Sequence, residues 1–441
     1  MLSASAYRCF LSLALLVMLV ASCGRAPEKS EGRVVIEFWH AMGSSQGRAV
    51  NTIVDSFNKS QDKYYVRAVY QGNYNALSQK LIASLYARRN PAVSQMYPSW
   101  TSRFFQYGYL EPMQTFVDRD PSFNEVLADM YPVMVAEATV DHPETGKPTL
   151  ATLPFNKSVY VVQANWTMME KAGWTKPPAT REEFIRLARD LTVMPAGAER
   201  PSMHGFATRG LIEDYTVQMM AANSTIVDEK TGEIFVDSPE SIATLKYLLN
   251  LVRSEDGRPI GYVESDYLSK VLGSELVGMY IASTASFTFN DDAVGNKFIW
   301  RAFAVPAARE GETARTLMQG TNVGIFRNLT PEESEAAWEF AKFLTKPETN
   351  AQWAKLTAYM PIRRATLEVP DFAAYLEGNI SYANSVATLD TATFEPRMMY
   401  WESVRQILNT RVQAILRGRE TPEDSMAAAR REILAVQKGA Q

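Results

Sequence analysis

The sequence predicts an α/β fold in which the chain forms two lobes and ends in a helix-rich C-terminal part. Two observations support this prediction. Extended apolar runs alternate with helical patterns from residue 33 onward, and after residue 330 almost every segment has the pattern of a helix. The length of 441 residues suits two lobes of about 200 residues each, and no internal repeat is present.

The chain after residue 32 begins as a βαβαβ unit. Short, mainly apolar runs predict strands at 33–39, 64–70 and 92–97. The helices between them carry apolar residues at helical spacing, namely Val50, Ile53, Val54 and Phe57 in the first and Leu77, Leu81 and Leu85 in the second. This order predicts a mainly parallel sheet that is covered by helices.

Local patterns also predict the later strands and several helix starts. Further strands are expected at 158–163, 276–281, 298–305 and 322–326. A capping residue followed by proline and glutamate predicts helices that begin after Ser238, Thr330 and Thr421. A last helix is expected at 427–436.

The first 22 residues predict a lipoprotein signal peptide. Arg8 is followed by a run of apolar and small residues from Phe10 to Ala21, which is shorter than the roughly 20 residues that a membrane span needs. The run ends in Val20-Ala21-Ser22-Cys23, which resembles a bacterial lipobox with Cys23 as the lipidated residue. The alternative is a cleaved signal followed by an unrelated cysteine.

This segment predicts where the protein works. Residues 23–32 are polar and are expected to form a flexible tether. Acyl chains on Cys23 would hold the protein on a membrane surface, since burial of each CH₂ contributes about 0.8 kcal/mol. We therefore expect an extracytoplasmic, lipid-anchored protein on the periplasmic side or the cell surface.

Composition argues against several function classes. The formal net charge of -4 disfavours a nucleic-acid partner bound through bulk charge. The chain has two cysteines, Cys9 and Cys23, both in the N-terminal segment, and three histidines. So few soft ligands argue against a zinc or redox enzyme, and we expect no metal and no cofactor.

One motif suggests an esterase. Residues 43–47 read Gly-Ser-Ser-Gln-Gly, the G-x-S-x-G pattern that exposes a nucleophilic serine between a strand and a helix. Ser45 would then be the nucleophile, but His142 and His204 both lie in polar loop sequence. We favour a glycine-serine turn at the start of a helix. Nothing else requires catalysis, and we expect a protein that is not an enzyme.

Aromatic and small polar residues gather where strands end or turns begin. The groups are Phe38-Trp39-His40, Gly72-Asn73-Tyr74, Tyr97-Pro98-Ser99-Trp100, Phe155-Asn156-Lys157-Ser158 and Thr357-Ala358-Tyr359. Ligands of open α/β sheets bind outside the carboxyl ends of the strands, and aromatic rings stack on polar ligands there. Together these groups predict a binding cleft for a polar small molecule.

These residues also carry a family likeness. The lipobox, the strand ending in Phe38-Trp39-His40 and the helix closed by Phe57-Asn58 resemble the extracellular solute-binding proteins (family 1) of ABC importers. Three further motifs resemble the glycerol-3-phosphate-binding branch: Tyr70-Gln71-Gly72-Asn73-Tyr74, Leu153-Pro154-Phe155-Asn156 with Ser158, and Tyr359-Met360-Pro361-Ile362. The likeness runs over nearly the whole chain after the signal segment.

The resemblance implies a periplasmic-binding-protein-like (type II) fold with a hinge. The first lobe would comprise 33–150 and 300–360, and the second 151–299 and 361–436. The ligand would bind between the lobes, which close around it, and the closed form would dock on an ABC permease. The resemblance also implies a monomer that binds a small solute.

The resemblance further implies a set of ligand-binding residues. These are Tyr74, Ser158, Ser283, Gly320, Tyr359 and Arg405. Arg405 is expected to bind phosphate, because a guanidinium is a planar fork suited to bidentate contact. Pro98 stands where the branch has a glutamate that contacts glycerol hydroxyls, and Trp100 nearby is expected to face choline or to stack on a sugar.

The expected ligand is therefore a glycerophosphoryl compound. Both glycerol-3-phosphate and a glycerophosphodiester fit the resemblance, and the loss of the glutamate at Pro98 puts free glycerol-3-phosphate in doubt. A sugar or oligosaccharide remains the alternative ligand class.

Overall fold

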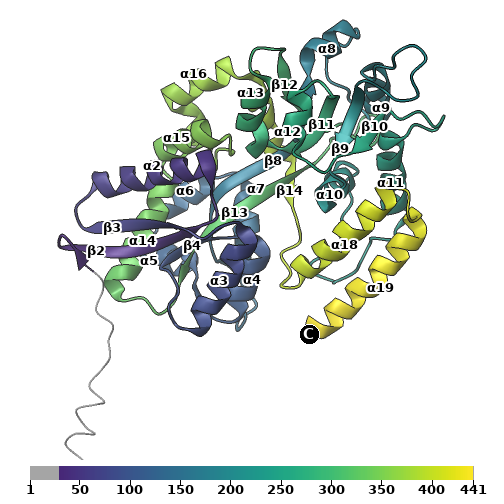
Figure 1. Cartoon of the computed structure of the whole chain (residues 1–441). Coiled ribbons are helices and arrows are strands. Elements are labelled where there is room, and N and C mark those ends of the chain that lie inside the picture. The colour runs from purple at the N-terminus through teal and green to yellow at the C-terminus, as the bar shows by residue number, and fades with distance from the viewer. Residues whose placement is uncertain (1–28, 441) are drawn as a thin grey trace, which may run out of the picture.

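The computed structural model describes residues 29–440, so the predicted signal peptide, Cys23 and most of the tether lie outside the described residues. The described chain forms two lobes built around one twelve-stranded mixed sheet (Figure 1). The N-terminal elements are β1 (Lys29–Ser30), β2 (Arg33–His40), α2 (Ser44–Ser60), β3 (Tyr64–Tyr70), α3 (Tyr74–Tyr86), β4 (Val93–Met96), α4 (Pro98–Gln106), β5 (Leu110–Glu111), α5 (Met113–Arg119), α6 (Phe123–Asp129), α7 (Pro132–Ala138), β6 (Thr139–Asp141) and β7 (Pro148–Leu150).

The central and C-terminal elements follow in alternation and end in helices. The central ones are β8 (Leu153–Asn165), α8 (Trp166–Lys171), α9 (Arg181–Asp190), β9 (His204–Thr208), α10 (Ile212–Ala221), α11 (Pro239–Val252), β10 (Gly261–Val263), α12 (Leu268–Gly273), β11 (Val277–Ser283), α13 (Phe287–Val294) and β12 (Trp300–Phe303). The last ones are β13 (Thr316–Phe326), α14 (Pro331–Leu344), α15 (Pro347–Thr357), α16 (Pro370–Gly378), α17 (Ile380–Ala387), β14 (Ala392–Phe394), α18 (Trp401–Leu416) and α19 (Pro422–Ala440).

The predicted βαβαβ start is confirmed. Strand β2 pairs in parallel with both β3 and β4, and helices α2 and α3 connect the three strands. The apolar faces predicted for these helices are buried, including Val50 and Phe57 on α2 and Leu81 on α3. The two helices therefore pack on the sheet through the same apolar residues whose spacing predicted them.

The expectation of a mainly parallel sheet is wrong at the centre of the molecule. Strands β8 and β13 are longer than predicted and pair antiparallel with each other, and β13 also runs antiparallel to β4. A continuously buried strand has apolar residues on both faces, and this pattern carries no information about the direction of its neighbours.

Strand β8 passes from one lobe into the other. Its residues 153–159 pair with β13, while residues 160–165 pair with β11 and with β12 on the opposite side. Leu153, Phe155, Val159 and Val161 of β8 pack in one hydrophobic core, and Val162 and Ala164 pack in another. We name the lobe around the core that contains Phe38 and Val159 the first lobe, and the lobe around the core that contains Val162 and Trp401 the second lobe.

The C-terminal segment divides between the lobes later than predicted. Phe372, Tyr382 and Leu389 pack in the core of the first lobe, although the expected division placed 361–436 in the second lobe. Only α18 and α19 pack in the second core, beside α10 and α11 (Figure 1). The spacing of apolar residues on a helix shows which face is buried but not which core receives it.

The predicted helix starts are confirmed. Thr330 accepts a hydrogen bond from the Glu333 amide, and Glu333 accepts one from the Thr330 amide, which completes a capping box at α14. The Ser238 side chain caps α11 by accepting a hydrogen bond from the Ser241 amide. Thr421 precedes Pro422, the first residue of α19.

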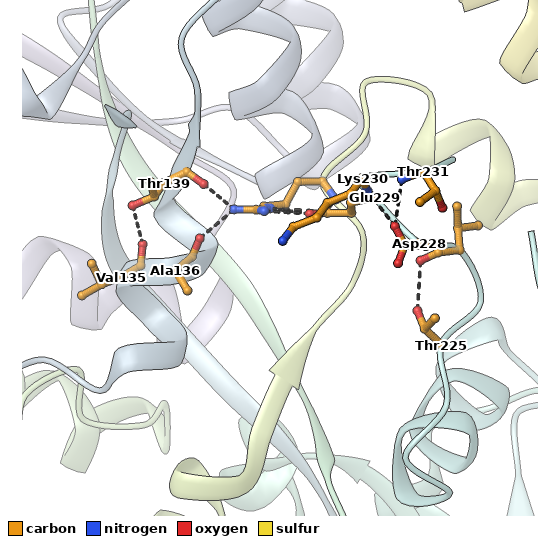
Figure 2. A network of polar contacts seen from close by, with 10 residues as sticks. Val135, Ala136, Thr139, Thr225, Asp228, Glu229, Lys230 and Thr231 are labelled. Atoms are coloured by element: carbon orange, nitrogen blue, oxygen red, sulfur yellow. Dashed lines mark hydrogen bonds and ion pairs between the residues drawn. The ribbon is translucent and has the colours of Figure 1, made fainter. Parts of the chain in front are cut away.

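One arginine in the segment between β14 and α18 links the two lobes. Figure 2 shows Ala136 and Thr139, at the end of α7, on one side of this contact and Glu229 on the other. Arg397 donates through Nη1 to the carbonyls of Ala136 and Thr139, and through Nη2 to Glu229 at 2.7 Å. The Arg397 guanidinium also lies over the Phe394 ring, 5.0 Å from its centroid, which is within the range of about 6 Å for a cation–π contact.

Candidate functional site

Two cavities lie between the lobes. The smaller cavity, of about 190 Å³, is lined by α3, α4 and β13 of the first lobe and by α10, α18 and the segment after β14. The larger cavity, of about 750 Å³, is lined mainly by residues of the second lobe together with Ser44, Gln46 and Tyr359. Glu213 lines both cavities, so they lie side by side. Residues from both lobes thus face the same space.

Three aromatic rings form one wall of the smaller cavity. Tyr74 is the first residue of α3, and Tyr97 and Trp100 lie at the start of α4. The Tyr74 and Tyr97 ring centroids are 4.8 Å apart, and Trp100 meets Tyr97 edge-on at 5.3 Å. Pro98 begins α4, where its missing N–H costs no hydrogen bond. The wall therefore presents rings at fixed angles rather than a single flat surface.

A buried polar network holds this wall in place. The Asn156 side chain is fully buried on β8 and donates from Nδ2 to the Tyr74 hydroxyl at 3.1 Å. Its Oδ1 accepts from Gln95 Nε2 at 2.9 Å and from the Thr321 hydroxyl. Burial raises the pKa of Tyr359, and hydrogen bonds with Asn156 and Tyr74 oppose that shift. The two tyrosines are thus neutral hydroxyls with a fixed orientation.

Arg405 on α18 is held between two carboxylates. Its Nη1 donates to Glu395 and its Nη2 donates to Glu213, and all three side chains are mostly buried. Gln319 on β13 donates to the second oxygen of Glu395 at 3.0 Å. Burial lowers the pKa of Arg405, but the two carboxylates outweigh burial and raise this pKa above its ordinary value. The guanidinium remains charged, and the protein itself balances that charge.

The smaller cavity is acidic. Glu137, Glu213, Glu395 and Glu402 line it beside Arg405. Glu137 forms a buried ion pair with Lys157, so its charge is balanced as well. The remaining three carboxylates face one guanidinium. A bidentate contact of Arg405 with phosphate would therefore compete with two carboxylates and meet a surplus of negative charge.

Gly320 brings the backbone of β13 close to β8 beside this cavity. Its φ is +122°, and a Cβ at this position would lie 2.0 Å from the Asn156 carbonyl oxygen. No other residue type fits such an approach without moving backbone. The predicted glycine thus acts through the space it leaves between two strands.

The larger cavity has a different lining. Arg209, Tyr267, Lys270 and Ser283 contribute polar groups, and apolar atoms make up most of the wall. Ser283 caps the turn after β11, where its Oγ accepts from the Ala285 amide at 3.2 Å. The Ser283 hydroxyl donates to none of the described residues, so its proton is available to a ligand.

The predicted site residues fall into three groups. Tyr74, Trp100, Gly320 and Arg405 line the smaller cavity, and Ser283 and Tyr359 line the larger one. Ser158 is buried on β8 opposite Gln319 of β13 and lines neither cavity. The residues of the first two groups are brought together from segments more than 300 positions apart.

The structure adds three charged residues that sequence reasoning missed. Glu213 and Glu395 pair with Arg405, and Arg209 lines the larger cavity. Glu213 lies in the first turn of α10, where an acid is ordinary helix chemistry. A pairing over 192 positions, as between Arg405 and Glu213, leaves no local pattern in one sequence.

The residues of the esterase motif form the turn that the sequence analysis favoured. Gly43 is the N-cap of α2, and Ser45 lies in its first turn. His142 lies 5.5 Å from the Phe105 ring and His204 lies 4.7 Å from the Tyr262 ring, centroid to centroid. Neither histidine is hydrogen-bonded to Ser45 within residues 29–440.

The described part of the chain has neither a membrane-spanning helix nor a cluster of metal ligands. Between residues 29 and 440, no helix is both long and apolar enough to cross a bilayer. Over the same residues, no group of three or more His, Cys, Asp and Glu side chains is placed to hold a metal ion.

Comparison with known proteins places the chain in a family. The family model for the bacterial extracellular solute-binding proteins matches residues 52–377. The sn-glycerol-3-phosphate-binding periplasmic protein UgpB of Yersinia pseudotuberculosis is 25% identical over 406 residues, which cover 89% of each chain. The protein of the same name from Pectobacterium atrosepticum is 23% identical over 409 residues, again 89% of each chain.

Solved structures show the same two-lobe fold. UgpB from Mycobacterium tuberculosis in complex with glycerophosphocholine superimposes with a TM-score of 0.77 at 20% identity, over 93% of this chain and 99% of the other. The sugar-binding protein MalE from Xanthomonas citri has a TM-score of 0.76 at 17% identity, over 92% and 98%. The predicted two-lobe α/β fold is confirmed. With a family match over most of its length, this chain belongs to the bacterial extracellular solute-binding proteins of ABC importers.

Proposed function

We propose that the protein captures a glycerophosphodiester with a cationic headgroup, of the glycerophosphocholine type, and delivers it to an ABC permease. The observation that carries this proposal is the smaller cavity, where the Tyr74, Tyr97 and Trp100 rings face an excess of carboxylates. Aromatic faces and carboxylates attract a quaternary ammonium, and each cation–π contact contributes about 0.5–2 kcal/mol.

The same cavity argues against free glycerol-3-phosphate as the preferred ligand. That ligand carries only negative charge, and Arg405 already has two carboxylate partners. The relatives named for glycerol-3-phosphate binding support a glycerophosphoryl ligand. The fold of the glycerophosphocholine complex supports a diester.

A sugar or oligosaccharide is the second candidate. Carboxylates that accept hydrogen bonds from hydroxyls, beside aromatic rings, also suit a carbohydrate, and MalE shares the fold. Under either ligand the protein acts without catalysis, as a monomer, and is held on the membrane through lipid on Cys23.

Calorimetry with four ligands tests the proposal. We expect glycerophosphocholine to bind with micromolar or tighter affinity, glycerol-3-phosphate at least tenfold more weakly, and choline and maltose not at all. Trp100→Leu should weaken glycerophosphocholine at least tenfold. Trp174→Leu is the matched control, since Trp174 is half-buried, bonded to Asp190 and outside both cavities.

Two results would redirect the assignment. If calorimetry shows heat of binding with maltose or a longer oligosaccharide and none with glycerophosphocholine, the ligand is a carbohydrate. Tighter binding of glycerol-3-phosphate than of the diester would show that the acidic lining does not select against an anion.

Incorporation of labelled palmitate in wild type but not in Cys23→Ala would support the anchor, and equal incorporation would disprove it.

A further inference from the structure

The larger cavity contains an arginine that forms no ion pair with any residue between 29 and 440. Arg209 follows strand β9 and is half-buried in the cavity wall. Its guanidinium lies over the Tyr267 ring, 5.7 Å from the centroid, and its Nε is buried without a hydrogen-bond partner. Within residues 29–440 it forms no ion pair. A half-buried guanidinium with a free N–H donor is a site for an anion.

The other basic groups of the two cavities are already paired. Lys270 donates to both oxygens of Asp266, at 2.9 and 3.2 Å. Arg405 is shared by Glu213 and Glu395. Arg209 therefore differs from both in forming no direct ion pair with a carboxylate among the described residues, although Asp214 and Asp266 lie near enough for their charges to interact with it.

The acidic groups that face the larger cavity are Glu213, Asp214 and Asp292. Glu213 is paired with Arg405, and Asp214 accepts a hydrogen bond from the Leu211 amide at 2.9 Å as the cap of α10. Asp292 is exposed at the surface of α13, where water screens its charge. The first two charges are thus engaged by protein, and the third is solvated.

A neutral donor lies in the same wall. Ser283 points its capping oxygen at the Ala285 amide and keeps its O–H free for a ligand. A phosphate has more acceptor oxygens than one guanidinium can fill, so a hydroxyl donor nearby complements Arg209.

The smaller cavity on its own is smaller than a typical ligand site. The smaller one, at about 190 Å³, is below the roughly 300–1,000 Å³ that small-molecule sites occupy. A solute bound there would extend past Glu213 into the larger cavity, which has about 750 Å³. An extended ligand with two chemically different ends matches this pair of spaces.

We propose that Arg209, in the larger cavity, binds the phosphate of the solute while its cationic end lies against the aromatic wall of the smaller cavity. This inference rests on the proposed function and adds to it the residue that binds the anion. It assigns the phosphate to Arg209 rather than to Arg405. The ligand would then be recognised as a zwitterion by two separate charge sites.

The test compares Arg209→Gln, Arg209→Lys and wild type in calorimetric titrations with glycerophosphocholine. Arg209→Gln should weaken binding at least twentyfold, and Arg209→Lys should recover part of the loss. Arg301→Gln is the matched control, because Arg301 is a half-buried arginine over the Trp166 ring and outside both cavities. It should bind as wild type does.

A second probe separates this inference from the proposed function. Inorganic phosphate at low ionic strength should raise the melting temperature of wild type and of Arg301→Gln, but not of Arg209→Gln. If glycerophosphocholine binds wild type and Arg209→Gln within twofold, the proposed function stands and the role of Arg209 is wrong. If glycerophosphocholine does not bind at all, an equal phosphate response, or none, in wild type and Arg209→Gln overturns the anion site.

Discussion

The two cavities that meet at Glu213 use their charged residues in opposite ways. In the smaller cavity Arg405 is held by Glu213 and Glu395, and Glu137 is paired with Lys157, so most charges are satisfied within the protein. In the larger cavity Arg209 lies over the Tyr267 ring and forms no direct ion pair with a carboxylate among the described residues.

This difference shows that the most conspicuous arginine of a site need not be the one that binds the ligand's charge. A guanidinium between two carboxylates contributes shape and hydrogen-bond donors, but little net attraction for an anion. A guanidinium without a partner contributes its full charge. On our proposal, the smaller cavity therefore recognises the cationic end of the ligand, and the larger cavity recognises its anion.

The largest expected effect tests whether the smaller cavity depends on the close approach of two strands. Gly320→Ala places a Cβ against the Asn156 carbonyl in a backbone conformation that disfavours side chains. We expect a loss of at least about 3 kcal/mol in the free energy of unfolding, measured by urea denaturation. Gly378→Ala, at the end of α16 with open space around it, should change stability by less than about 1 kcal/mol. Equal losses would refute this reason for Gly320.

The next prediction concerns how stability depends on pH. Asp214 in the larger cavity and His40 behind the smaller one should change stability in opposite directions. Burial raises the pKa of Asp214, which lines the larger cavity, to about 6, and hydrogen bonds from Thr208 and Leu211 oppose the shift. Because the folded pKa lies above the unfolded value, this group loses about 3 kcal/mol of stability as pH rises from about 4 to 6. Asp214→Asn should remove that loss in urea titrations from pH 4 to 7.

His40, which lies behind the smaller cavity, should change stability with pH in the opposite direction to Asp214. It accepts from the Met42 amide, and Met42 in turn contacts the Tyr74 hydroxyl. Burial lowers the pKa of His40 to about 4, so its contribution of about 3 kcal/mol is present above pH 6.5 and lost as pH falls towards 4. In His40→Gln, the free energy of unfolding should fall as pH rises from about 4 to 6, because the opposing contribution of His40 is gone. A pH profile unchanged by both substitutions would contradict both shifts.

A smaller effect is expected where Arg397 joins the lobes. Arg397→Gln removes the contacts to Glu229 and to the carbonyls at the end of α7 (Figure 2). We expect a loss of about 2 kcal/mol and a larger radius of gyration in X-ray scattering without ligand. Arg430→Gln breaks an exposed ion pair with Asp237 and should cost at most about 1 kcal/mol with no change in radius. An unchanged radius in both variants would show that Arg397 does not hold the lobes together.

The smallest expected effect comes from removing one carboxylate contact of Arg405, which makes the smaller cavity more like the larger one. Glu395→Gln leaves Arg405 with a single carboxylate and should raise the affinity ratio of glycerol-3-phosphate to glycerophosphocholine about tenfold, or about 1.4 kcal/mol. Glu402→Gln removes the same charge from the same cavity without touching a bond to Arg405, and should change the ratio less. Equal ratios in both variants would mean that the pairing of Arg405 does not set ligand preference.

The fold could be predicted from the sequence to the extent that each element has its own pattern. The apolar spacing of α2 and α3 and the capping residues Thr330 and Ser238 are local, and the structure has these helices where expected. The mixed direction of the central sheet could not be predicted, because β8 and β13 are buried on both faces. The placement of α16 and α17 on the first core could not be predicted either, since their apolar faces suit either core.

The candidate site, like the fold, could be predicted only in its local features. Tyr74, Trp100, Gly320 and Arg405 were identified through motifs, and they line one cavity. Their electrostatic setting was not identified. Glu213 and Glu395 reach Arg405 from α10 and from the segment after β14, and neither has a local signature.

By itself, the sequence identified Tyr74, Trp100 and Gly320 as candidate site residues and identified the family that the chain resembles, since these depend on residue types in short motifs. Only the tertiary structure decided which charges remain available to a ligand. The availability of a charge depends on what lies within a few ångströms in space. The ion pairs of Arg405, and the absence of an ion pair at Arg209 among the described residues, arise from chain segments that meet only in the folded protein.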